Sequence, residues 1–279
     1  MDYRTLSKKK ASKIKTFSDD LSKLIEEIQK EVKDTAEESL SLFEEDSDVV
    51  KLTVRNAQKL SKTKDRLNTL VLASFVALFA LIAKKEWDTW QLNKAYIKSM
   101  VSLDKSVEQK ARDRVLLSLG IRDNKLISGG WLSGIGSPDA VVGLVMREIA
   151  QVMAANTSLS TFRKRFKSVF VGVGLIERYF NGFTFDLFNK IDRAHGVELA
   201  EQVGLKHAIY SGTIKNNTRD FCRERVSEVF TKDQIKNWEN LNWKGKNKNY
   251  NPYIDLGGYN CRHSLDWITE ELANTLKSN

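Results

Sequence analysis

The sequence predicts a mainly α-helical protein, with a long-helix N-terminal region followed by a small α+β C-terminal domain. Three observations support this fold class. The chain has only 2 prolines, and most of its 15 glycines lie beyond Gly120, so little interrupts a helix in the first half. Apolar residues there recur every three or four positions, as on one face of a helix. After Gly204 the pattern changes to short strand-like pieces and loops.

The composition is that of an ordinary soluble protein of 279 residues, with 41% hydrophobic and 29% charged residues. A formal net charge of +9 suits contact with nucleic acid, an anionic membrane or acidic proteins, and it equally suits a soluble protein that is merely basic. Two cysteines exclude a disulfide-rich secreted scaffold. No apolar block follows the first residues as in a signal peptide, so synthesis in a reducing cytoplasm is expected.

The first predicted helix covers residues 6–43, because its apolar residues form one narrow stripe. The stripe consists of Ile14, Phe17, Leu21, Leu24, Ile25, Ile28 and Val32. A stripe this narrow indicates a coiled-coil or helix-hairpin partner. Acidic residues then interrupt the pattern, and either Asp46 or Ser47 is expected to cap the basic amphipathic helix that follows. Residues 1–66 are therefore assigned to amphipathic, coiled-coil-like helices.

Leu67–Ala83 is the most apolar run of the chain and has two interpretations. A membrane span needs about 20 apolar residues, so the slightly short run favours a buried or oligomer-facing helix. Flanking Lys and Arg residues, with Trp87 and Trp90 just after them, suit a bilayer interface and a membrane-inserting segment. On either interpretation the contacting side chains are Leu70, Phe75, Leu78, Phe79 and Ile82.

Further helices are expected up to residue 204, completing a helical domain over residues 67–204. A glycine-rich segment at 128–138 lacks the Gly-Lys-Ser/Thr ending of a phosphate-binding loop and is predicted to be a connector. Pro138 suits the start of the next helix. The helix expected after it mixes basic residues with phenylalanines, which is typical of a solvated helix face or of nucleic-acid backbone binding. The candidate DNA-binding residues are Arg163, Lys164, Arg165 and Lys167.

The last long helix is predicted over residues 183–204, with His195 at its surface or boundary and Gly204 as its stop. The change of composition after Gly204 places a domain boundary there, so residues 205–279 form the small C-terminal domain.

That domain is expected to begin with a strand over residues 206–210. Thr218 is expected to cap a helix over residues 219–229, and Thr231 to cap a second helix. Gly257-Gly258 allows a backbone turn that a side chain would block.

Ordered short motifs at residues 210–263 form the most specific pattern in the chain. A Tyr-x-Gly element precedes Thr-Arg-x-Phe-Cys, then Phe-Thr leads into a short helix, and Gly-Gly-Tyr-Asn-Cys-Arg-His follows. The residues concerned are Tyr210, Gly212, Thr218, Arg219, Asp220, Cys222, Gly257, Gly258, Asn260, Cys261, Arg262 and His263. The set resembles the C-terminal domain of the Mu F-like phage head morphogenesis family, over about the last quarter of the chain. One departure is Ser227-Glu228, where that family often has Gly-Lys, which affects the expected turn.

The resemblance implies a phage minor virion protein that acts in head morphogenesis and has no established enzymatic activity. It implies production with the portal and major capsid proteins, a place in the head interior or at the portal vertex, and assembly in the host cytoplasm. No resident cofactor follows from it. The family's variable helical N-terminal region agrees with the helices predicted independently above.

The residues themselves leave several chemistries open for the two cysteines. Cys222, Cys261 and His263, with His207, can make a tetrahedral Zn²⁺ site, although Cys-x-His is tighter than the usual ligand spacing. A disulfide can form after release into an oxidising medium. A packed polar core, in which Arg219 and Arg262 bind carbonyls or carboxylates, is favoured. A catalytic Cys/His pair lacks an assignable orienting residue.

Three functional hypotheses follow. The leading one is a minor head protein that binds the portal or inner capsid through its helices, as an oligomer, with basic faces touching packaged DNA. The second is an ejected virion protein whose 67–83 helix inserts into the host envelope. The third is a Cys/His hydrolase or nuclease domain carried in the head.

Overall fold

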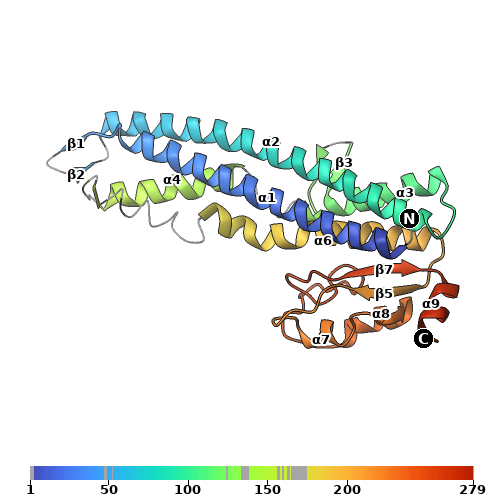
Figure 1. Ribbon diagram of the computed structural model, residues 1–279. Helices are drawn as coiled ribbons and strands as arrows, with labels where there is room; N and C mark the ends of the chain where they lie inside the picture. The colour runs from blue at the N-terminus through green and yellow to red at the C-terminus, as the bar shows by residue number, and fades with distance from the viewer. Residues whose placement is uncertain are drawn as a thin grey trace. The chain divides into compact units, whose positions relative to one another are not determined.

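The computed structural model describes residues 3–46, 49–51, 53–123, 125–132, 138–155, 158, 160–161, 164 and 175–278. Over these residues the chain is mainly α-helical, with a small three-stranded sheet near the C-terminus, which confirms the predicted fold class (Figure 1). Contacts divide the chain into two compact units. Unit 1 comprises Met1–Asp19, Ala83–Gly134 and Phe183–Asn279, and unit 2 comprises Asp20–Ile82 and Ile135–Gly182. This division differs from the three consecutive segments expected from the sequence.

Two long helices, α1 (Tyr3–Leu40) and α2 (Val54–Lys98), run antiparallel (Figure 1). In unit 1 the Lys85 ammonium lies 4.6 Å from the centre of the Phe17 ring. In unit 2 Arg66 pairs with Glu38 at 2.9 Å. Every residue of the predicted stripe except Leu24 is buried, none more than 5% exposed. The narrow stripe therefore marks the seam of a helix hairpin, one of the two partners expected from its width.

A short hairpin of two strands, β1 (Glu45–Asp46) and β2 (Val49–Val50), connects α1 to α2. The predicted cap at Asp46 is wrong, because Asp46 belongs to β1, and Ser47 lies outside the described residues. Helix α2 begins eight residues later, where the Thr53 hydroxyl accepts from the backbone N–H of Asn56 at 3.2 Å. The Asn56 amide also binds the carbonyls of Glu44 and Lys51, both at 2.8 Å, so it closes the connection.

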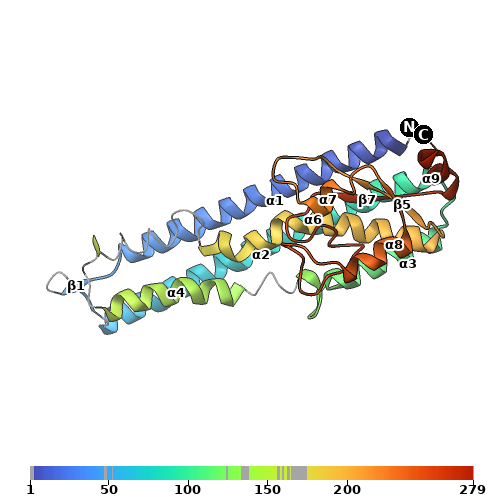
Figure 2. The same ribbon diagram turned by 90° about the horizontal axis from the view of Figure 1, so that it is seen from below.

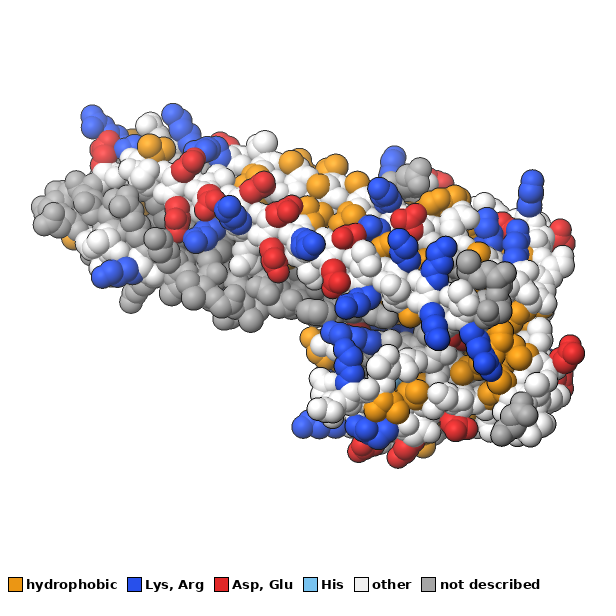
Figure 3. Space-filling model, in the orientation of Figure 1, with side chains coloured by type: hydrophobic (Ala, Val, Ile, Leu, Met, Phe, Trp, Pro, Cys, Tyr) orange, Lys and Arg blue, Asp and Glu red, His pale blue; other side chains and the backbone are white. Residues whose placement is uncertain are grey.

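The apolar run Leu67–Ala83 lies in the middle of α2. Of its predicted contact residues, Leu78 and Ile82 are buried at 2% and 0% exposure, while Leu70, Phe75 and Phe79 are half-buried. Leu72 and Val76 are 57% and 64% exposed, and apolar side chains gather over this part of α2 in Figure 3. Among the described residues, α2 is the one helix long and apolar enough to cross a membrane, with 28% of its most apolar window buried.

Within the described residues, the remaining helices before the sheet are α3 (Lys105–Leu119), α4 (Pro138–Ala154) and α6 (Leu175–Gln202). A two-stranded hairpin of β3 (Ile121–Arg122) and β4 (Lys125–Leu126) follows α3. Helix α4 begins at Pro138, as predicted. Of the candidate DNA-binding residues, Lys164 is exposed, whereas Arg163, Arg165 and Lys167 lie outside the described residues.

The C-terminal part of unit 1 is built on a three-stranded antiparallel sheet in the order β6-β5-β7. Its strands are β5 (His207–Ser211), β6 (Val229–Thr231) and β7 (Ser264–Ile268). Around it lie α7 (Asp220–Arg223), α8 (Lys232–Lys236), a 3₁₀ helix at Asn237–Asn240 and α9 (Glu270–Lys277). Figure 2 shows this group against α6, with which it shares a core.

Of the two threonine helix caps predicted in this region, one is confirmed and the other is wrong. Thr231 caps α8 through a reciprocal capping box with Gln234, as the Thr signal predicted. The predicted helix over 219–229 is wrong, because α7 has only 4 residues and begins after Arg219. The Thr218 hydroxyl instead accepts from the backbone N–H of Lys215 at 2.7 Å, which holds a turn.

Candidate functional site

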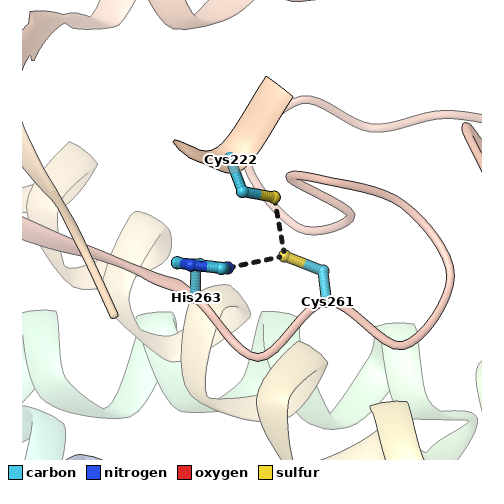
Figure 4. Close-up of side chains that lie close together, drawn as sticks. All are labelled: Cys222, Cys261 and His263. Carbon is cyan, nitrogen blue, oxygen red and sulfur yellow. Dashed lines mark hydrogen bonds between the residues drawn. The ribbon is translucent and has the colours of Figure 1, made fainter. Parts of the chain in front are cut away.

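The two cysteines converge with His263 in one buried cluster (Figure 4). Cys222 comes from α7, whereas Cys261 and His263 come from the segment that enters β7. The two Sγ atoms are 3.9 Å apart, and His263 Nδ1 is 3.6 Å from Cys261 Sγ. The candidate ligand atoms of the three residues all lie within 4.8 Å of one another. Side chains separated by 39 positions in the sequence therefore lie close enough to surround a single ion.

Tyr210 completes the cluster from β5. Its hydroxyl donates to Cys222 Sγ at 3.2 Å and lies 3.8 Å from Cys261 Sγ. Tyr210 is 0% exposed, both cysteines are 2% exposed, and His263 is 7% exposed. Burial raises the pKa of the Tyr210 phenol, so it is present as a hydrogen-bond donor. The phenol and the two sulfurs are therefore all shielded from solvent.

The two thiols share protons unequally. The hydrogen bond to Cys261 raises the pKa of the Cys222 thiol, and burial raises it further. The same bond lowers the pKa of Cys261, where the charge of Arg193 and a hydrogen bond to His263 also favour the thiolate against the effect of burial. The hydrogen bond between the sulfurs therefore favours the thiol at Cys222 and the thiolate at Cys261, and both cysteines are free of a disulfide.

Two glycines of the motif are required because other atoms approach them closely. A Cβ on Gly257 would lie 2.2 Å from Cys222 Sγ and 3.1 Å from Cys261 Sγ. A Cβ on Gly212 would lie 2.3 Å from the His263 ring. The Gly257 N–H also donates to Cys261 Sγ at 3.3 Å. Side chains at these positions would separate the cluster's own residues.

Arg193 on α6 fixes the backbone of the cluster, a role that no sequence motif indicated. Its guanidinium donates to the carbonyls of His263 at 2.9 Å, of Ile254 at 2.7 Å, and of Cys261. Arg193 is only 2% exposed. A rigid fork of donors thereby holds three carbonyls from separate points of the same loop.

The other motif residues support nearby turns. Arg219 donates to the Tyr259 carbonyl at 2.6 Å, as the packed-core interpretation expected for it. Gly258 has φ +86°, and a Cβ there would lie 2.0 Å from the Gly245 carbonyl oxygen. Asn260 has φ +57°, and its N–H donates to Asp186 at 2.8 Å. Arg262 and Asp220 are exposed and lie outside these contacts.

Neither of the other two histidines belongs to the cluster. His207 is not among the ligand atoms that lie together, because it begins β5 and alternation places it on the opposite sheet face from Tyr210. The expectation that His195 is a surface or boundary residue is wrong. His195 is 0% exposed, and its Nε2 lies 3.1 Å from the Glu86 carboxylate.

Buried charges elsewhere in unit 1 tie α1 and α2 to the C-terminal elements. Lys10 is 3% exposed and lies 3.4 Å from Asp192 and 3.3 Å from Asp266. Burial lowers the pKa of Lys10, but the two carboxylates outweigh it and hold the pKa above its usual value. Asn93 donates to Asp192 at 2.8 Å and lies 3.4 Å from the Lys10 ammonium. This group joins side chains from four separate segments.

Comparisons of the chain with protein-family models, with curated proteins and with solved structures found no match. The chemistry of the site therefore has to be argued from its own atoms. Two cysteine sulfurs, an imidazole and a phenol, all buried together, can bind a soft cation or simply pack. Both cysteines are only 2% exposed, so neither sulfur is open to a substrate in solvent.

Proposed function

We propose that this chain is a structural protein of a phage head, acting in head morphogenesis in the manner of the Mu F-like family. Its helices bind the portal or the inner capsid, and its C-terminal domain supplies a rigid attachment. The proposal takes its class from the ordered motif at residues 210–263.

One observation carries the structural character of the proposed role. The centre of the motif is a buried framework of side chains from three separated segments: Tyr210, Cys222, Cys261 and His263. Gly212 and Gly257 allow close approach to His263 and the two sulfurs. Catalytic thiols are partly exposed, because the thiolate must reach a substrate. Both sulfurs here are 2% exposed, so the motif is better explained as a support than as an active centre.

Packaged DNA is a further partner in this proposal. The formal net charge of +9 favours contact with a polyanion. Lys164, the described member of the basic helical group, is exposed and available for a phosphate.

The test uses a phage or an inducible prophage that encodes the chain. We expect mass spectrometry of purified particles to find the chain at a copy number close to that of the portal protein and far below that of the major capsid protein. We expect deletion of its gene to reduce the yield of infectious particles, with rescue by the wild-type chain supplied in trans. Absence of the chain from purified particles would overturn the proposal.

A second candidate role is insertion of α2 into the host envelope after ejection. The observation in its favour is the exposed apolar face around Leu72 and Val76 on a helix long enough to span a bilayer. Flotation of the full-length chain with anionic liposomes tests it. We expect Leu72→Asp together with Val76→Asp to abolish flotation if α2 inserts, whereas charge reversal at exposed Lys8 and Lys9 serves as the control for surface adsorption. A chain that stays at the bottom of the gradient excludes insertion.

A further inference from the structure

We propose that Cys222, Cys261 and His263 bind one Zn²⁺ ion and that Tyr210 closes the site, which makes it a structural metal centre of the C-terminal domain. This inference goes beyond the proposed head function and does not depend on it.

Two of the three donor–donor distances match a tetrahedral zinc site, and the third, between Cys222 and His263, is at most 4.8 Å. With Zn–S bonds of about 2.3 Å and Zn–N bonds of about 2.0–2.1 Å, tetrahedral angles give an S···S edge of about 3.8 Å and an S···N edge of about 3.6 Å. The corresponding distances are 3.9 Å between the sulfurs and 3.6 Å from Cys261 Sγ to His263 Nδ1. The three donor atoms lie within 4.8 Å of one another, so one cation can lie among them.

The Tyr210 oxygen lies at distances from the two sulfurs that suit a fourth corner of the tetrahedron. A metal–oxygen bond of about 2.0–2.2 Å gives an S···O edge of about 3.5 Å. The phenol oxygen lies 3.2 Å from Cys222 Sγ and 3.8 Å from Cys261 Sγ, on either side of that value. Because Tyr210 is 0% exposed, no water has access through this corner. Catalytic zinc sites keep one position open, so this site is structural.

The surroundings are suited to two thiolates. The Gly257 N–H donates to Cys261 Sγ at 3.3 Å, and Arg193 holds the Cys261 and His263 carbonyls in place. Without metal, the two sulfurs share one hydrogen bond at 3.9 Å, in which either sulfur can be the donor. When Zn²⁺ binds, the thiol proton in this hydrogen bond is released to solvent, and the positive charge of the ion stabilises both thiolates. Two thiolates with a neutral imidazole then balance a divalent ion.

The choice of zinc follows from the donor set. Thiolate sulfur selects Zn²⁺, Cu⁺ or iron–sulfur clusters over the hard cations Mg²⁺ and Ca²⁺. A mixed sulfur and imidazole set with tetrahedral edges is typical of Zn²⁺.

The direct test measures metal in the wild-type full chain. We expect the protein, expressed with zinc in the medium and purified under reducing conditions without chelator, to contain about one Zn²⁺ per chain by elemental mass spectrometry. Replacement by Co²⁺ should give thiolate-to-cobalt charge-transfer bands and the intense visible bands of tetrahedral Co²⁺. A folded wild-type chain that contains no zinc and gives no cobalt bands on titration would overturn the proposal.

Variants assign the ligands. We expect Cys222→Ser, Cys261→Ser and His263→Gln each to reduce zinc content to near zero. His207→Gln is the matched control and should keep full occupancy, because His207 lies away from the cluster. Tyr210→Phe opens the fourth corner, so we expect it to retain metal but to lose it to a chelator about 10-fold faster or more. Loss of zinc in His207→Gln, or full occupancy in both cysteine variants, would contradict the assignment.

Thiol counting in the denatured wild-type chain separates coordination from oxidation. We expect two reactive thiols per chain after removal of the metal by a chelator, since neither cysteine is in a disulfide. Zero thiols, together with zero zinc, would mean that the cysteines pair with each other instead.

Discussion

The C-terminal sheet of unit 1 and the helices of unit 2 are stabilised in different ways. Around the sheet, Arg193 binds three carbonyls and buried residues from several segments have fixed polar partners. In unit 2 the described part of the helix pair depends on an apolar seam, with residues such as Leu21, Val32 and Val71 at 0–1% exposure. Polar contacts there are mostly on the surface, such as Arg66 with Glu38.

This difference explains why the region around the sheet contains ordered sequence motifs and the helices of unit 2 do not. A polar framework needs particular side chains at particular positions, so it produces recognisable motifs. An apolar seam accepts many residues of suitable size at the same spacing and leaves only a period in the sequence. The ordered motifs of the sequence therefore lie around the sheet, whereas the contacts with partners in the proposed role come from the helices.

The largest expected effect follows from removing the buried ammonium of Lys10 in unit 1. Lys10→Met leaves Asp192 and Asp266 buried without their counter-charge, which typically costs about 3–5 kcal/mol. All 6 tryptophans lie in unit 1, so their fluorescence during denaturation reports on that unit alone. Lys9→Met on the exposed face of α1 is the matched control and should leave the midpoint unchanged. Equal midpoints for both variants would show that the buried charges do not stabilise unit 1.

The seam of unit 2 should respond to loss of volume. We expect Leu78→Ala, at a position 2% exposed, to destabilise unit 2 by about 2–4 kcal/mol. Leu72→Ala, at a position 57% exposed on the same helix, should cost far less. Far-ultraviolet circular dichroism measures the loss of helix, while tryptophan fluorescence should change little. A fluorescence midpoint that shifts with Leu78→Ala as far as the dichroism midpoint would mean that the two units unfold together.

Acid should weaken unit 1 through Glu86. Burial raises the pKa of this carboxyl, but hydrogen bonds from His195 and Arg112 outweigh it and hold the pKa below its usual 4.5. A depressed folded pKa stabilises the protein above the unfolded value, and this stabilisation is lost as the pH falls through the folded value. We therefore expect Glu86→Gln to flatten the fall in fluorescence midpoint below about pH 4.5, at a cost in stability at neutral pH. The exposed Glu228→Gln should follow the wild type at every pH.

The smallest effect concerns the turn after α7. Ser227 has φ +74°, a left-handed conformation that glycine adopts without strain. We expect Ser227→Gly to stabilise unit 1 by about 1 kcal/mol. Ser227→Ala keeps the Cβ and should give no gain. A midpoint that is equal in both variants would mean that the turn carries no strain.

Local signals in the sequence predicted much of the fold. The period of the apolar residues located the long helices, and Thr231 with Gln234 located the start of α8. The Thr218 cap failed because the same hydroxyl serves equally well in a turn, where it accepts from Lys215. Strand alternation is also a local signal, and applied to residues 206–210 it separates His207 from Tyr210.

The long-range parts of the site could not be predicted in this way. Burial of His195 depends on Glu86, 109 residues earlier in the chain. Arg193 acts on carbonyls 61 to 70 residues later, and a carbonyl leaves no mark in the sequence. The two cysteines and His263 could be grouped from their types, whereas the proximity of the Tyr210 phenol required the sheet.

The pairing of α1 with β7 has a consequence for synthesis of the chain. The Ser7 hydroxyl donates at 2.5 Å to the carboxylate of Asp266, which lies 259 residues later in the chain. Lys10 pairs with the same carboxylate. At about 5–20 residues per second, a ribosome needs roughly 13 to 50 seconds to add the partner after the first residues emerge. Lys10 therefore stays hydrated on the nascent chain, and unit 1 closes only once β7 has left the ribosome. Prematurely terminated chains, which lack β7, would leave Ser7 and Lys10 without the Asp266 carboxylate.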